Sequence, residues 1–201
     1  MIEAVVFDVG KVLIEWERDL PFRRLIPDTA TRTWFMETVI PLEWHGQHDA
    51  GRGAAEMITE RSAEFPEHAH LIEAWLSHFN ETISGPVPGS EAIVAALHAR
   101  EVPLYAITNF GADTWAGFVP TWPLRHHFID IVVSGDEKLA KPDPAIYALA
   151  EARFGRAADT MLFVDDSLPN VESARENGWH AHHFVNAETL RAHLVERGLL
   201  G

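Results

Sequence analysis

Four short apolar runs in this chain each stop on polar residues, and this pattern predicts the fold. The runs are rich in Val, Ile and Phe, which is typical of strands buried on both faces of a parallel sheet. Ligands of such sheets bind beyond the carboxyl ends of the strands, so we expect the polar residues to converge at one edge. The runs and the residues after them are Ala4–Phe7 with Asp8, Leu104–Ile107 with Thr108 and Asn109, Ile131–Val133 with Ser134, Gly135 and then Lys141, and Met161–Val164 with Asp165 and Asp166.

A segment of helical character separates the first predicted strand from the second. From Trp16 to Ser84, apolar residues recur at spacings of three and four, as in Trp34, Phe35, Val39 and Leu42. Prolines and glycines interrupt this segment, so several short helices are expected. We predict a helical cap over residues 16–85, closed by a Gly- and Pro-rich turn cluster at 85–89, and a core made of residues 1–15 and 86–201.

Helices and strands are expected to alternate through the rest of the chain. We predict an α/β fold, a doubly wound Rossmann-like parallel sheet core with a small all-helical cap inserted after the first strand. Asp143 before Pro144, Gly178 and Asn186 are expected to mark helix ends. The expected helices are 90–100, 144–154, 168–177 and 187–197, with one more between the second and third strands, and the expected later strands are 102–107, 129–133, 161–164 and 180–185.

The charge balance limits the partners. The 201 residues include 16 basic and 30 acidic side chains, a formal net charge of -14, and no cysteine. Nucleic acids and anionic membranes are therefore not expected as partners, because binding a polyanion requires a basic surface. A small phosphorylated metabolite stays compatible, since a metal ion and a lysine can neutralise it locally. Without a signal peptide or an apolar run of ~20 residues, we expect a soluble cytoplasmic protein that is a monomer or a weak homodimer.

The acidic residues at the strand ends have more than one interpretation when each is taken alone. Asp8 could attack phosphorus as a nucleophile, bind a metal ion or simply belong to a turn. Asp165 and Asp166 repel one another at the end of an apolar strand, which favours a nearby cation. Oxygen ligands are those that Mg²⁺ prefers. The alternative for this pair is a solvent-facing helix cap.

The remaining two polar sites are informative because of their order along the chain. Thr108 and Asn109 could cradle phosphate oxygens or form an ordinary turn. Lys141 could place a point charge on a phosphoryl group and on the nucleophile, or be solvated. Each reading is weak alone, but all four sites follow successive predicted strands in one chain, and this order favours a phosphate-handling site.

These four sites resemble the four motifs of the haloacid dehalogenase-like hydrolase superfamily, in the branch with a helical cap. VVFDVGKVLIEW resembles the first motif, YAITNF the second, KPDPAIYALA the third and FVDDSLPNVESARENG the fourth. The resemblance implies a Mg²⁺-dependent phosphomonoester hydrolase that acts through an aspartyl-phosphate intermediate. It also implies the roles of the residues: Asp8 as nucleophile and metal ligand, Thr108 and Asn109 as phosphate ligands, Lys141 as the neutralising cation, Gly10 as a metal ligand through its carbonyl group, Asp166 as a direct metal ligand, and Asp165 as a direct or water-mediated one.

Gly10 departs from the pattern of typical phosphatases in this superfamily. In those phosphatases the position of Gly10 is occupied by a second aspartate, which serves as general acid and base. Groups of this kind contribute ~10²–10⁴-fold to the rate. A sub-branch of small sugar-phosphate phosphatases shares the Asp-x-Gly motif, so the glycine alone does not imply an inactive protein. If no residue replaces the acid, the enzyme should depend strongly on leaving-group quality. Cap residues that could face the site are Glu43, His45, His48 and Asp49, with His45 and His48 as candidate acids.

Two alternatives keep the same fold. A metal-independent 2-haloacid dehalogenase would require an arginine near the leaving halide, for which Arg18, Arg23, Arg24 and Arg52 are available. Gly10 also permits a catalytically retired family member that only binds a phosphorylated ligand. The paired aspartates favour phosphate chemistry over halide chemistry. Structural zinc at paired histidines is not expected, and Trp16, Trp34, Trp44 and Trp75 are predicted to form the core of the cap.

Overall fold

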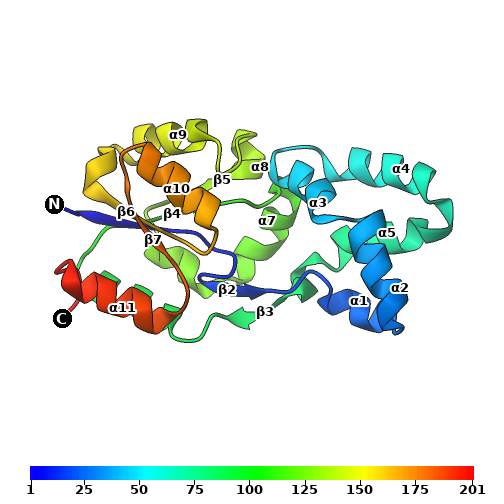
Figure 1. Cartoon of the computed structure of the whole chain (residues 1–201), viewed down its shortest axis with the longest axis horizontal. Helices are drawn as coiled ribbons and strands as arrows, with labels where there is room; N and C mark the ends of the chain where they lie inside the picture. The colour runs from blue at the N-terminus through cyan, green and yellow to red at the C-terminus, as the bar shows by residue number, and fades with distance from the viewer.

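The chain forms a five-stranded parallel sheet covered by helices on both faces (Figure 1). The structure, a computed structural model, describes residues 1–201. The strand order is β5-β4-β1-β6-β7, and all four neighbouring pairs are parallel. The predicted α/β class with a doubly wound sheet and a helical insertion after the first strand is therefore confirmed. The strands are β1 Ala4–Phe7, β4 Leu104–Thr108, β5 Asp130–Val133, β6 Met161–Asp165 and β7 His180–His183.

The central strand β1 shows why these residues form a buried sheet. Its four residues are all fully buried. Val5 and Phe7 pack into the cluster under α6 (Ser90–Ala99), α7 (Ala112–Phe118) and α11 (Ala187–Glu196). Ala4 and Val6 pack into the cluster under α9 (Pro144–Phe154) and α10 (Leu168–Glu176). Side chains alternate between the two faces of a strand, so a run without polar residues satisfies both layers of helices.

The helices begin and end close to the predicted positions. The side chain of Asp143 accepts a hydrogen bond from the amide of Ala145, and that of Asn186 accepts one from Thr189. Gly178 has a positive φ of 86° just after α10. None of the helices is both long and apolar enough to cross a bilayer. The core helices are α6 Ser90–Ala99, α7 Ala112–Phe118, α8 Ser134–Glu137, α9 Pro144–Phe154, α10 Leu168–Glu176 and α11 Ala187–Glu196.

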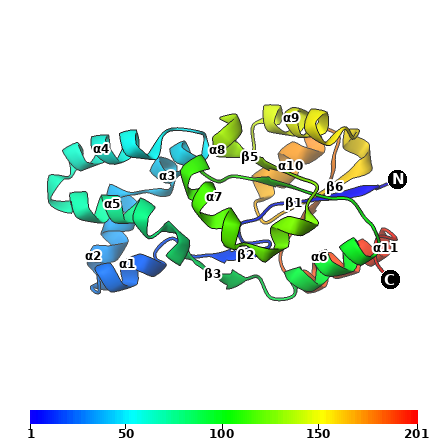
Figure 2. The same cartoon turned by 180° about the vertical axis from the view of Figure 1, so that it is seen from behind.

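The insertion after β1 forms a separate helical lobe at one end of the molecule (Figures 1 and 2). It has its own cluster of 12 buried apolar residues, in which the rings of Trp44 and Trp75 lie 4.7 Å apart. The prediction that Trp34 belongs to this core is wrong, because its side chain is exposed. The helices of the insertion are α1 Leu20–Leu25, α2 Thr29–Trp34, α3 Leu42–Asp49, α4 Ala54–Glu64 and α5 Ala69–Ser77, with a π-helical turn at Phe35–Val39.

A two-stranded antiparallel ribbon connects the two parts of the chain and was not predicted. It pairs β2 (Ile14–Trp16) with β3 (Ile83–Pro86). Residues 83–86, which were expected to end a helical segment and begin a turn, therefore form a strand. The pairing partners are far apart in sequence, and each strand is too short to give a periodic signal. The predicted boundaries of core and cap, 15/16 and 85/86, both fall inside this ribbon, and the division into these two domains stays a prediction.

Candidate active site

Three carboxyl groups meet at the carboxyl edge of the sheet. Asp8 follows β1, Asp165 ends β6 and Asp166 comes next. One carboxylate oxygen from each of the three lies within 4.8 Å of the others. The strands β1 and β6 are hydrogen-bonded neighbours, with Phe7 beside Val164, and this register brings the acidic residues together. Convergence at this edge is what the four sequence patterns predict.

Lys141 neutralises part of this acidic cluster. Its Nζ lies 2.9 Å from Oδ1 of Asp8 and 2.7 Å from Oδ2 of Asp165, and it donates to the carbonyl oxygen of Ile107 at 2.8 Å. The residue is only 4% exposed. Burial lowers the pKa of the ammonium group, but the two carboxylates outweigh burial and raise the pKa overall. Lys141 is therefore a fixed positive charge in contact with Asp8.

Asp8 is buried and held in one orientation. Its Oδ1 accepts a hydrogen bond from the amide of Val9 and contacts Lys141, and no protein donor contacts Oδ2. Burial raises the pKa of Asp8 to about 7, Lys141 opposes this shift, and Asp165 and Asp166 add to it. A further cation would favour the ionised carboxylate, because it would offset the repulsion within the cluster.

Asp165 and Asp166 differ in their surroundings. Asp165 is fully buried, and its carboxylate accepts hydrogen bonds from the amide of Ser167 and from Nδ2 of Asn170 as well as from Lys141. Asp166 is partly exposed and lines a cavity. Burial and the neighbouring Asp165 raise the pKa of Asp166, while the positive charge of Lys11 lowers it. The carboxylate of Asp165 is thus held by hydrogen bonds within the protein, whereas that of Asp166 is accessible from the cavity.

Thr108 and Asn109 lie at this edge but are not equivalent. Thr108 is 1% exposed and does not line the cavity. Asn109 lines the cavity, and its side chain holds the main chain of Lys141: Nδ2 donates to the Lys141 carbonyl and Oδ1 accepts from the Lys141 amide, both at 2.8 Å. The structure thus gives Asn109 a second task, the placement of Lys141. Phosphate binding by the pair stays a prediction.

A cavity of about 450 Å³ opens over the acidic cluster, between the core and the insertion. Its core wall includes Asp8, Asn109, Lys141 and Asp166, and its cap wall includes Trp16, Leu42, His45 and Asp49. Gly10 lines the same cavity. Of the predicted cap residues, His45 and Asp49 therefore reach the site, whereas Glu43 and His48 do not line it. The size suits a small molecule.

Asn170 is a site residue that the sequence argument did not single out. Its Nδ2 lies 3.1 Å and 3.0 Å from the two oxygens of Asp165, and its carbonyl oxygen accepts a hydrogen bond from the hydroxyl of Tyr147. The signal was present, because Asn170 lies inside the stretch FVDDSLPNVESARENG. It was hidden because an Asn in the first turn of a helix is common for other reasons.

Comparison with known proteins identifies the family of this chain. The model of the haloacid dehalogenase-like hydrolases matches residues 2–178. The chain therefore belongs to the haloacid dehalogenase-like hydrolases. This result confirms the resemblance inferred from the four motifs.

Several curated relatives are phosphatases. The chain is 32% identical over 143 residues to a phosphoserine phosphatase from Thermus thermophilus, a match that covers 70% of this chain and 52% of the relative. It is 24% identical over 184 residues to a phosphoglycolate phosphatase from Mesorhizobium japonicum, covering 87% and 78%. The chain thus spans about half the length of the first relative and about three quarters of the second.

Solved structures support the fold. A predicted HAD-like family hydrolase from Porphyromonas gingivalis superposes with a TM-score of 0.75 at 20% identity, covering 98% of each chain. A HAD family enzyme from Bacteroides thetaiotaomicron, in a magnesium complex, gives a TM-score of 0.72 at 20% identity over 96% of this chain and 98% of that one. An L-2-haloacid dehalogenase from Xanthobacter autotrophicus gives 0.67 at 18% identity, covering 98% and 83%. At these identities the similarity defines the fold alone.

Proposed function

We propose that this protein is a Mg²⁺-dependent phosphomonoester hydrolase that acts on a small phosphorylated metabolite through an aspartyl-phosphate on Asp8. The observation that carries the proposal is the cluster of Asp8, Asp165 and Asp166 with a single buried lysine beneath a cavity. Three carboxylates against one ammonium group leave negative charge that a divalent cation would balance.

The residues present fit a magnesium ion. The donors are carboxylate oxygens within 4.8 Å of one another, without histidine or cysteine, which suits a hard cation. Asp8 and Asp166 would bind the ion directly, Gly10 through its carbonyl group, and Asp165 directly or through water. When bound, the ion would polarise the phosphoryl oxygens and reduce the repulsion between phosphate and carboxylates.

The protein's own residues would carry the reaction in a simple order. Oδ2 of Asp8, which no protein donor contacts, would attack phosphorus, while Lys141 holds Oδ1 and balances the growing charge. Asn109 keeps Lys141 in place through its two main-chain hydrogen bonds. The cap wall of the cavity would limit the access of water to the transferring group. Water would then release phosphate from Asp8.

The relatives support a phosphatase more than the alternatives. The phosphoserine phosphatase and the phosphoglycolate phosphatase described above match 70% and 87% of this chain, whereas the (S)-2-haloacid dehalogenase 2 from a Pseudomonas strain matches 42% of it, at 29% identity. A metal-independent dehalogenase has no need of Asp166, the accessible carboxylate beside the nucleophile. A retired protein would retain the cluster without turnover, and assays separate these cases.

The test is hydrolysis of p-nitrophenyl phosphate with Mg²⁺ and with EDTA. We expect turnover that EDTA abolishes and Mg²⁺ restores, and no release of halide from 2-haloacids. A panel of sugar phosphates, nucleotides and phosphorylated cofactors would then identify the substrate. Turnover that survives chelation, or halide release, would refute the proposal. Mg²⁺-dependent binding of beryllofluoride without turnover on any phosphoester would indicate the retired protein instead.

A further inference from the structure

The place of the second aspartate in this site is empty space. A methyl group on Gly10 would meet no heavy atom within 4 Å, so the position has room for a side chain and carries none. Hydrolysis of a phosphoester with a poor leaving group requires a proton for the departing oxygen and a base for the attacking water. The residue that supplies them has to line the cavity and stand apart from the nucleophile and its lysine.

Only one cavity carboxyl group meets these conditions. The carboxyl groups that line the cavity belong to Asp8, Asp49 and Asp166. Asp8 is bound by Lys141, and Asp166 belongs to the acidic cluster. We propose that Asp49, the last residue of α3, is the general acid and base of this site. This inference rests on the phosphatase function proposed above and deepens it.

Asp49 belongs to the insertion, yet the core holds it in place. Its main-chain oxygen accepts a hydrogen bond from Oγ of Ser134 at 2.5 Å. Ser134 is fixed in turn by the amide of Phe110 at 3.0 Å. Phe110 also lines the cavity. The loop after β4 therefore contributes to the wall of the cavity and, through Ser134, helps to position Asp49.

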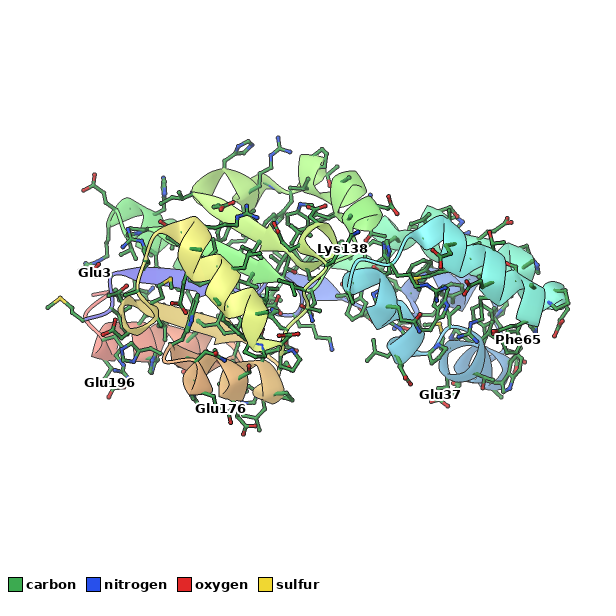
Figure 3. The ribbon with its side chains drawn as sticks, turned by 90° about the horizontal axis from the view of Figure 1, so that it is seen from above. Glu3, Glu37, Phe65, Lys138, Glu176 and Glu196 are labelled. Carbon is green, nitrogen blue, oxygen red and sulfur yellow. The ribbon has the colours of Figure 1, made fainter.

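The turn after Asp49 is packed closely against the core. Gly51 has a φ of 93°, and a methyl group there would lie 2.6 Å from Cγ of Lys138 and 3.1 Å from the carbonyl oxygen of Gly135. Figure 3 shows Lys138 where the core meets the helical lobe. Only glycine combines this backbone conformation with such a close approach. The cap carboxyl group is thus anchored at the junction of the two lobes.

The surroundings of Asp49 suit proton transfer near neutral pH. Burial raises the pKa of Asp49 to about 7, and the hydrogen bond from Gly111 opposes the shift. At neutral pH both protonation states are then populated, which is what a group needs in order to donate a proton in one step and accept one in the next.

His45 and His48, the candidate acids from the sequence, are less suited. Nδ1 of His45 accepts a hydrogen bond from Nε1 of Trp75 at 2.9 Å, so the neutral ring carries its proton on Nε2, 3.5 Å from Oδ2 of Asp49. Burial lowers the pKa of His45 to about 3, and the charge of Arg18 adds to this effect. His48 is 1% exposed and lies outside the cavity lining.

The protons balance over the two steps. In the first step Oδ2 of Asp8 forms a bond to phosphorus, the bond from phosphorus to the leaving oxygen breaks, and the proton of Asp49 passes to that oxygen. In the second step a water oxygen attacks phosphorus, its proton passes to the Asp49 carboxylate, and the bond between phosphorus and Asp8 breaks. Inorganic phosphate leaves, and Asp49 is protonated again.

Leaving-group dependence tests the assignment. Asp49→Asn should lower kcat/KM by about 10²–10⁴-fold on alkyl phosphates, whose alkoxides require protonation. On p-nitrophenyl phosphate, whose phenolate leaves unaided, the loss should be less than about tenfold. Glu43→Gln, on the same helix but outside the cavity, is the matched control and should change neither rate. Adding Gly10→Asp to Asp49→Asn should restore part of the alkyl phosphatase activity, since that position has room.

Binding of beryllofluoride with Mg²⁺ reports whether the variant site is intact. Unchanged binding with a selective loss on alkyl phosphates supports the assignment. An Asp49→Asn enzyme that hydrolyses alkyl phosphates at the wild-type rate would overturn it, and so would equal losses on both substrates. If Asp49→Asn does not fold, Asp49→Glu keeps the acid and should retain alkyl phosphatase activity; its failure to do so while folded would overturn the assignment as well. Absence of Mg²⁺-dependent turnover in the wild type would instead refute the phosphatase function itself.

Discussion

Replacing Lys141 with methionine should destabilise the protein by leaving two carboxylates unpaired. Nζ of Lys141 lies 2.9 Å from Asp8 and 2.7 Å from Asp165, and the lysine is 4% exposed. At an effective dielectric constant of about 20, each contact is worth roughly 6 kcal/mol before desolvation. Desolvation offsets most of this energy, and removal of one partner from a buried pair costs about 3–5 kcal/mol.

The assay for this prediction is urea unfolding without metal at pH 7.5. With a slope of about 2–3 kcal/mol per molar urea, the Lys141→Met midpoint should fall by roughly 1–2.5 M. Mg²⁺ should stabilise Lys141→Met more than the wild type, because the more negative site binds the cation more tightly and bound ligand stabilises the fold. Lys138→Met, a change at an exposed lysine without an ion pair, is the control. A Lys141→Met midpoint equal to that of the control would refute the view that Lys141 compensates the buried carboxylates.

Three further changes probe the site. Asp8→Asn should fold normally and lose turnover on every substrate, because an amide is a poor nucleophile. The control Asp136→Asn, on the exposed side of α8, should keep its turnover. Residual activity of Asp8→Asn above background in a phosphate-release assay would exclude Asp8 as the nucleophile. Asn170→Ala should lower the free energy of unfolding by about 1–3 kcal/mol, because Asp165 loses two buried contacts; an unchanged urea midpoint would contradict this. The pKa of Asp49 is raised to about 7, so the folded state retains its proton between about pH 4 and 7 while the unfolded state loses it. The stability of the wild type relative to Asp49→Asn should therefore fall by about 2 kcal/mol between pH 5 and 7 and level off above pH 7; a difference independent of pH would mean that the pKa is not raised.

The core was predictable because its local signals agree. Each buried strand is an apolar run, each run ends on a polar residue, and residues such as Asp143 and Asn186 cap the helices that follow. Parallel pairing then determines which strand ends meet, so Asp8 and Asp165 could be brought together before any coordinates were known. The strand limits shifted by one or two residues, and Thr108 and Asp165 are themselves the last residues of their strands.

The cap and the details of the site were less predictable. The ribbon of β2 and β3 depends on a pairing between distant segments, and Trp34 has the helical spacing of a core residue but points to solvent. The two hydrogen bonds of Asn109 to Lys141 follow from the approach of two loops 32 residues apart. The placement of Asp49 depends on the core residue Ser134, which no pattern within the cap could reveal.

Detection of phosphate on Asp8 tests the central claim most directly. The wild type is mixed with Mg²⁺ and its best phosphorylated substrate, quenched in acid within the first turnover, digested and analysed by mass spectrometry. We expect phosphate on the peptide that contains Asp8, lost on treatment with hydroxylamine and absent both with EDTA and in Asp8→Asn. Rapid turnover in which this peptide never carries phosphate would contradict the account.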